Sequence, residues 1–346
     1  MGKTLLYVLL LGILGAGVYF FVFADNGNPF GAGQANFSVR DTAAIRKIFL
    51  SRTNGQSVEL TRTDSGWVVN GSYAARQAPV NLLLGTMKRQ EAKFPVPENA
   101  HNNIVRSLAG NSVKVEVYDV SGLIKTFFVG GQAHNSEGTF MLMQGAQRPY
   151  VVQVPGFIGY ISPVYDTDPL NWRSRSVFNL PAEQIREVAV TYPAEPVNSF
   201  VIRQEGGIRV SADPAAANGQ PVNEGRVRSY LQFFTDINAE GYLEDIPGID
   251  STIASMPHFC SIGVTSTTGW KQQVDIYLMP LNKRSKNMAV PEPSDYDADR
   301  FYAVFNNKKD TAIIQNFTFE KLFRRAPEFY GSERRSTVTP MPQVRQ

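Results

Sequence analysis

Hydrophobic positions in this chain follow two patterns: an unbroken run near the start, and alternation with polar residues over most of the remainder. The run covers residues 4–24 and contains no charged residue. About 20 apolar residues in a helix span the hydrocarbon core of a bilayer, which is roughly 30 Å thick. The first pattern therefore predicts a transmembrane helix, with residues 1–24 as a membrane anchor.

A cleaved signal peptide is the alternative, because the residues just before Asp25 resemble a small-residue cleavage site. The apolar region of a signal peptide spans only about 7–15 residues, so the length of the run favours an anchor. Lys3 precedes the run and Asp25 follows it, which places the N-terminus in the cytoplasm. We expect a single pass through the cytoplasmic (inner) membrane, with the folded part in the periplasm. Gly12 and Ala16 are four residues apart and are candidates for a helix contact within the membrane.

Alternation begins after residues 25–36, a Gly-, Asn- and Pro-rich stretch that we expect to be a flexible tether. Residues 45–50 and 57–69 alternate between apolar and polar positions on either side of Asn54-Gly55, a strong hairpin signal. The apolar positions then take the spacing of a helix, at Val80, Leu83, Leu84 and Met87.

The same order of patterns recurs in the second half of the chain. Alternating runs at residues 185–192 and 199–210 precede a helical spacing at Val227, Tyr230, Leu231 and Phe234. Each half then has a pair of alternating strands around a turn glycine, Gly122 or Gly269, and a last hairpin. The sequence predicts an α+β fold of two tandem repeated modules, each of mainly antiparallel strands with a helix. The modules are expected over residues 37–178 and 179–330, followed by a disordered tail over residues 331–346.

Charge and cysteine content narrow the range of partners. The chain has 34 basic and 31 acidic residues and a net charge of +3, which is too balanced for a nucleic-acid surface. Its single cysteine, Cys260, excludes an intramolecular disulfide and is typical of a small core residue.

Residues with catalytic or metal-binding chemistry are sparse, and we expect no enzymatic activity, metal or cofactor. Asp295, Asp297 and Asp299 match only the first half of a calcium-loop pattern, so a solvated loop before the strand at Phe301 is the preferred interpretation. His258 and Cys260 are two residues apart, which on a strand places them on one face. Two such ligands do not make a tetrahedral site.

Two groups of residues are candidates for contact with a partner. One comprises Trp172, Arg173 and Arg175, at the expected junction of the modules. The structural alternative is that the tryptophan fills the junction while the arginines pair with Asp166 or Asp168. The other group is Lys283, Arg284 and Lys286, which form the basic start of a long polar loop over residues 280–299.

Several of these segments also resemble a known family. The segments are IRKIFL, VELTR, Gly66-Trp67, a helix with Leu82, Leu83 and Leu84, IKTFFVGG, GTFMLM, PYVVQVPGF and Trp172-Arg173-Ser174-Arg175. Together they resemble the domain-of-unknown-function 4340 family of bacterial envelope proteins, over most of residues 37–180 and more loosely over the second module. The resemblance implies membrane-anchored, extracytoplasmic proteins with repeated α+β modules. Some of these are similar to proteins that accompany ABC-type transporters and gliding-associated auxiliary subunits.

Taken together, these features favour a binding role. We expect a non-catalytic, membrane-anchored accessory or scaffold subunit of an envelope complex, whose partner is another envelope protein or a second copy of the chain. A small-molecule ligand is not indicated. The alternative is an extracytoplasmic domain that binds glycan or peptide, or hydrolyses it.

Overall fold

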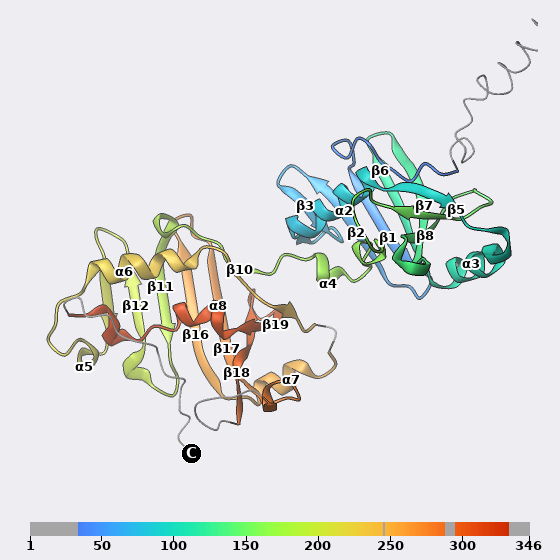
Figure 1. Ribbon diagram of the computed structural model, residues 1–346. Coiled ribbons are helices and arrows are strands. Elements are labelled where there is room, and N and C mark those ends of the chain that lie inside the picture. Colours follow the sequence, from blue (N-terminus) through green and yellow to red (C-terminus); the bar gives the residue numbers. More distant parts are fainter. Residues whose placement is uncertain (1–33, 245, 288–294, 332–346) are drawn as a thin grey trace, which may run out of the picture. The chain divides into compact units, whose positions relative to one another are not determined.

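The computed structural model describes residues 34–244, 246–287 and 295–331. The chain divides into two compact units, Met1–Ser174 and Arg175–Gln346 (Figure 1). The expected anchor, with Gly12 and Ala16, lies outside the described residues, as do most of the expected tether and tail. Within the part of the chain that is described, no helix is both long and apolar enough to cross a membrane.

The first unit is built on one antiparallel sheet, which has nine strands among its described residues, in the order β4-β3-β2-β1-β6-β7-β8-β9-β5. These strands are β1 (Lys47–Arg52), β2 (Ser57–Thr63), β3 (Gly66–Val69), β4 (Tyr73–Ala74), β5 (Glu91–Pro95), β6 (Val113–Asp119), β7 (Gly122–Gln132), β8 (Thr139–Met143) and β9 (Tyr150–Gln153). The helices are α2 (Gln77–Arg89), α3 (Glu98–Asn111) and α4 (Pro169–Trp172).

The second unit has an antiparallel sheet of eight strands in the described ranges, in the order β13-β12-β11-β16-β17-β18-β19-β15, and a small sheet of β10 and β14. The strands are β10 (Ser176–Phe178), β11 (Ile185–Thr191), β12 (Phe200–Arg203), β13 (Arg209–Ala212), β14 (Ile237–Asn238), β15 (Gly241–Tyr242), β16 (His258–Ser266), β17 (Lys271–Pro280), β18 (Tyr296–Phe305) and β19 (Asp310–Gln315). The helices are α5 (Pro214–Ala217), α6 (Glu224–Leu231), α7 (Ile249–Ala254) and α8 (Asn316–Phe319).

Strand order corresponds position by position between the two large sheets. The order β3-β2-β1-β6-β7-β8-β9-β5 of the first is matched by β13-β12-β11-β16-β17-β18-β19-β15 of the second, and β4 is an extra edge strand of the first. Of the expected turn glycines, Gly122 is the first residue of β7 and Gly269 lies between β16 and β17, with positive φ of 117° and 88° respectively. The α+β class with mostly antiparallel strands is therefore confirmed.

A helix covers the inner face of each sheet, as the apolar spacing predicts. In α2, Val80, Leu83 and Met87 are buried in the core of the first unit. In the second unit α6 ends at Leu231 and a 3-10 turn (Gln232–Phe234) continues it, so that Tyr230 and Phe234 both reach the core. Both predicted helices are present, but in the second unit an α-helix and a 3-10 turn together cover the predicted positions.

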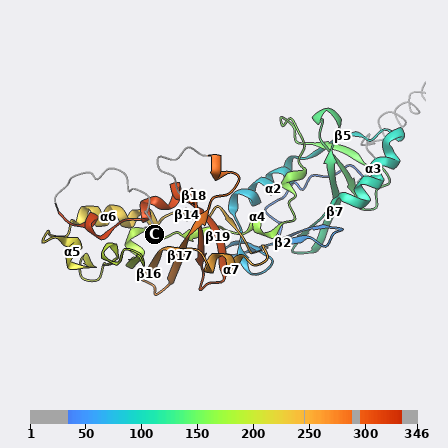
Figure 2. The ribbon, with the colours of Figure 1, turned by 90° about the horizontal axis from the view of Figure 1, so that it is seen from below.

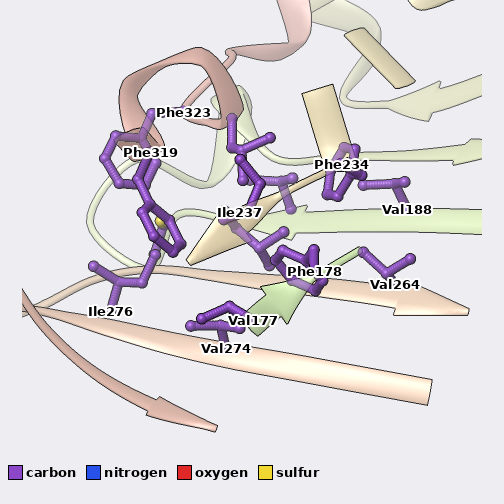
Figure 3. Packing of buried hydrophobic residues seen from close by; sticks show 14 of the residues in the cluster. Val177, Phe178, Val188, Phe234, Ile237, Val264, Val274, Ile276, Phe319 and Phe323 are labelled. Atoms are coloured by element: carbon purple, nitrogen blue, oxygen red, sulfur yellow. The ribbon is translucent and has the colours of Figure 1, made fainter. Parts of the chain in front are cut away.

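Aromatic side chains fill much of the second core, whose packing is shown in Figure 3. The rings of Phe178 and Phe234 meet edge to face with centroids 5.4 Å apart, which joins β10 to the turn after α6. Phe319 and Phe323 close the same core from the C-terminal segment. Edge-to-face pairs of this kind add about 0.5–1.5 kcal/mol beyond the burial of their area.

On the other face of the first sheet, α3 lies beside β7 (Figure 2). A Cβ at Gly130 would lie 2.5 Å from Leu108 Cδ2 and 3.1 Å from Phe140 O, so glycine at this position lets Leu108 pack closely against the strand. Neither α3 nor the edge strand β5 was expected from the sequence.

A buried polar network ties the start of the first unit to its end. Gln90 follows α2 and is fully buried; its Nε2 donates to Phe37 O at 2.7 Å, and its Oε1 accepts from the Tyr165 hydroxyl at 2.5 Å. Burial raises the pKa of Tyr165, so the hydroxyl stays protonated and acts as a donor. One amide side chain thus links three segments that are far apart in the sequence.

Substituting Tyr165→Phe is expected to lower the free energy of unfolding by about 1–3 kcal/mol, because Gln90 Oε1 is then buried without its donor. Tyr160→Phe is the matched control, since Tyr160 is 41% exposed and water can replace its hydroxyl contacts. Urea unfolding of both variants measures the difference. Equal stability of Tyr165→Phe and the unmodified chain would refute the role of this network.

Candidate functional site

Trp172 and Arg173, expected at a partner contact, are buried within the first unit. Trp172 ends α4, is 2% exposed, and donates from its indole Nε1 to Asp166 O at 2.9 Å. Arg173 is 4% exposed, and its guanidinium lies over the ring of Tyr73, 3.7 Å from the centroid. Trp172 and Arg173 themselves therefore offer almost no accessible surface to a partner.

The two carboxylates next to this pair stabilise a tight turn. Asp166 accepts from the backbone N of Asp168 at 3.0 Å and from Asn171 Nδ2 at 2.7 Å. Asp168 caps α4 by accepting from Leu170 N at 3.0 Å. These contacts position Trp172 for burial.

Arg175 belongs to the second unit, where it supports the small sheet of β10 and β14. Its Nη1 donates to Glu240 O at 2.5 Å, and its own carbonyl accepts from Ala239 N at 2.8 Å. The three junction residues are therefore divided between the two units. The Trp172 indole and the Arg173 guanidinium bind within the first unit, whereas the Arg175 guanidinium binds within the second.

The polar loop of the second unit is held by an ion pair between its two ends. Arg284 Nη2 lies 2.8 Å from Asp297 Oδ2, and its Nη1 lies 3.3 Å from Asp299 Oδ2. The side chain of Asp297 is fully buried, and β18 already begins at Tyr296. The expectation of a solvated loop before Phe301 was wrong for this reason.

Of the three basic residues expected at this loop, Arg284 is thus committed to an internal contact, whereas Lys283 and Lys286 are exposed. Within the described residues, no group of three or more His, Cys, Asp or Glu side chains is placed to hold a metal ion.

Arg284→Gln is expected to destabilise the second unit by about 2 kcal/mol. Removing one partner of a fully buried pair costs about 3–5 kcal/mol, and the cost is smaller here because water can reach the site through the 39% exposed arginine. Lys283→Gln, at the neighbouring exposed position, should leave stability within about 0.5 kcal/mol of the unmodified chain. Chemical denaturation decides between these outcomes, and equal effects of the two substitutions would contradict a specific pair.

A second ion pair joins β18, an inner strand of the large sheet, to Glu240 in the short segment between β14 and β15. Arg300 in β18 binds the carboxylate of Glu240 through two nitrogens, with Nε 2.5 Å from Oε2 and Nη2 on Oε1. The hydrogen bond from Arg300 holds the pKa of Glu240 below its ordinary value. The backbone of Glu240 meanwhile donates to Ile313 O at 2.8 Å and accepts from Arg175. Glu240 thus connects both sheets of the second unit.

Because the folded-state pKa of Glu240 is depressed, its pair with Arg300 stabilises the unit above the ordinary pKa of 4.5. This contribution is lost as pH falls through the lower folded-state value. Glu240→Gln should cost about 1.5 kcal/mol at pH 7 and progressively less at acid pH, because the unmodified chain then loses the same pair. Unfolding measured from pH 7 down to about pH 3 checks this. A constant difference between the two chains over that range would show that the charge of Glu240 does not matter.

A polar cluster on the second sheet was not anticipated from the sequence. Ser261 Oγ donates to Asp275 Oδ1 at 2.6 Å and lies 3.0 Å from His258 Nε2. Gln273 Nε2 also donates to Asp275, at 2.8 Å, and the His258 ring stacks on Tyr277 with centroids 4.8 Å apart. The signal that could have revealed it is the turn at Gly269, which sets the register that places Ser261 opposite Asp275.

The expected pairing of His258 with Cys260 on one face was wrong. The register of β16 against β17 shifts between these two residues, and such an irregularity breaks the period of two. Cys260 is fully buried, which raises the pKa of its thiol well above the ordinary value, whereas His258 is beside Ser261.

The proton arrangement of this cluster determines what it can do chemically. A serine hydroxyl has one proton, and here it is donated to the Asp275 carboxylate. The nitrogen of His258 must then donate to Ser261 Oγ, so it does not act as a base toward that hydroxyl in this geometry. The cluster presents polar groups suited to hydrogen bonding.

Comparison with known families and structures gives one match. A family model described as Domain of unknown function (DUF4340) matches residues 67–253, which is more than half of the chain. The matched region begins in β3 and ends in α7, so it includes parts of both units. Neither a curated protein nor a solved structure matches the chain.

Proposed function

The chain belongs to the family described as Domain of unknown function (DUF4340), and from this premise we propose that it is a non-catalytic, membrane-anchored accessory or scaffold subunit of a bacterial envelope complex. The observation that carries the proposal is the uncharged apolar run over residues 4–24, which precedes two sheet-based units. Confinement to a membrane raises the effective concentration of partners in the same bilayer without any new contact. A protein that acts by binding gains most from such an anchor.

We infer further that the two units are tandem copies of one module. The position-by-position agreement of strand order in the two large sheets supports this, as do the helix after the third strand and the turn glycines. Duplicated binding modules can divide their surfaces between different contacts. For the second module, the exposed Lys283 and Lys286 are the proposed contact with a partner, which is another envelope protein or a second copy.

The cluster of His258, Ser261 and Asp275 is the observation that favours the second candidate, an extracytoplasmic glycan- or peptide-binding or hydrolytic domain. Hydrogen-bonding groups next to an aromatic ring, here Tyr277, are suited to glycan or peptide ligands. Hydrolysis is less well supported because the Ser261 proton is directed at a carboxylate and away from the histidine. Isolated units that bind glycan or peptide would favour this candidate over a scaffold.

The full chain is expected to stay with membranes after an alkaline carbonate wash, and a chain lacking residues 1–36 should be released. Replacing residues 4–24 by an unrelated apolar span should preserve membrane attachment, because attachment depends on apolar length. Mass measurement of the N-terminus distinguishes an anchor from a signal peptide. Release of the full chain by the wash, or a mature chain that begins at Asp25, would overturn the proposal.

A partner contact is tested in the same membranes by chemical crosslinking. Lys283→Glu with Lys286→Glu should lower the yield of the crosslinked species about tenfold, the effect of roughly 1.4 kcal/mol. Lys308→Glu with Lys309→Glu, in the exposed β18–β19 turn of the same unit, is the matched control. Equal yields from both double variants would remove the loop from the proposal.

A further inference from the structure

The hairpin formed by β6 and β7 ends in a turn with exposed apolar side chains. Val120 is 83% exposed, Leu123 is 54% exposed and Ile124 is 40% exposed. All three lie within five consecutive residues at the end of the hairpin, and we call this end of the first unit the apolar tip. An exposed cluster of this kind commonly marks an interaction surface.

A polar contact closes the turn of this hairpin. The equivalent turn of the second unit, between β16 and β17, has Thr267 at the position of Val120 and Trp270, which is 44% exposed, at the position of Leu123. In the first unit the turn itself is stabilised by Asp119, which accepts from the backbone N of Ser121 at 2.7 Å. The exposed side chains of Val120, Leu123 and Ile124 take no part in this hydrogen bond.

The start of the described chain is bound next to this tip. Lys125 follows Ile124 in β7, and its Nζ donates to Asn36 O at 2.7 Å and to Ser38 O at 2.5 Å. Phe37, between these two residues, is buried against Phe127 with ring centroids 6.3 Å apart. The chain therefore enters the first unit at the end of the sheet that carries the apolar tip.

The length of chain before this point limits its distance from the apolar run. Twelve residues separate Ala24 from Asn36 in numbering, and a fully extended chain of that length reaches at most about 40 Å. If residues 4–24 cross a bilayer, Asn36 lies within that reach of its surface, and the tip ends one residue before Lys125, which binds Asn36.

We propose that the β6–β7 tip inserts Val120, Leu123 and Ile124 into the interface of the same bilayer that holds the N-terminal run. This inference rests on the proposed membrane anchoring. Apolar side chains enter the boundary between headgroups and acyl chains to a depth of about 5–10 Å. Asp119, whose carboxylate is held at the turn by Ser121, keeps the insertion shallow because a charge is costly in hydrocarbon. The first unit thereby gains a second attachment that orients it on the membrane.

Another exposed apolar segment of the first unit provides a control. Phe157 is 53% exposed and Ile158 is 92% exposed. The same segment continues to Ser162, whose Oγ donates to Gly130 O at 2.6 Å. Gly130 is eight positions along β7 from Gly122, about 25 Å away in a strand. This segment lies toward the opposite end of the sheet from the tip.

The experiment uses the full chain in vesicles of phosphatidylethanolamine and phosphatidylglycerol, with a fluorophore on a thiol introduced by Ser121→Cys. Ser107→Cys, on the exposed side of α3, is the matched control position. Cys260 is fully buried and so does not compete for the label. Nitroxide-labelled lipid should quench the fluorophore at position 121 at least about threefold more than at position 107, since only the tip contacts lipid.

In the Ser121→Cys chain, adding V120S, L123S and I124S should reduce the quenching to the level of position 107. Adding F157S and I158S should leave it unchanged. A chain that enters vesicles but shows equal quenching at both positions overturns the inference and leaves the anchoring intact. Quenching that survives the three tip substitutions overturns it too. A chain that does not enter vesicles overturns the anchoring and this inference with it.

Discussion

Each large sheet is held together by a pairing between two strands that are far apart in the sequence. β1 pairs with β6 in the first unit, and β11 pairs with β16 in the second. The facing apolar residues Ile48, Val117, Val188 and Val264 are all essentially buried. Closing loops of this length costs conformational entropy before any contact repays it. The burial on these central strands therefore has to offset that cost, and the outer strands then add to a sheet that already exists.

This central pairing also explains why a helix covers each core. The chain leaves β1 through β2 and β3 toward one edge of the sheet, yet β5 pairs with β9 at the opposite edge. To reach it, the chain must cross the sheet, and α2 makes this crossing with Val80 and Met87 buried against the inner face. In the second unit α6 makes the corresponding crossing, from β13 at one edge of the sheet to β15 at the other. The turns at the strand ends are not constrained in this way, which leaves them free to differ between the units.

Alternation and helical spacing were sufficient to predict most strands, both core-covering helices and the turn glycines, because these patterns record which face is buried. The edge strand β5 was missed because its residues, Glu91–Pro95, are mostly half-buried or exposed and do not alternate clearly. Asp297 appeared to be a loop residue because a sequence does not show that Arg284 neutralises it within a strand. The environment of His258 depends on a register shift, and the Ser261–Asp275 contact depends on cross-strand register. Charge partners and irregular pairing are therefore the features that sequence patterns do not record.

The two units differ in how closely they are connected to the proposed membrane anchor. In the first unit the ammonium group of Lys125 in β7 donates hydrogen bonds to two backbone carbonyls at the start of the described chain. Burial of Lys125 lowers the pKa of this ammonium group. These charge-assisted hydrogen bonds join the start of the described chain to a central hairpin of the sheet. In the second unit the corresponding hairpin turn has Thr267 and Thr268, and it exposes Trp270. Under the proposed function, the first unit is the one fixed close to the membrane anchor, and the second carries the proposed partner contact at Lys283 and Lys286.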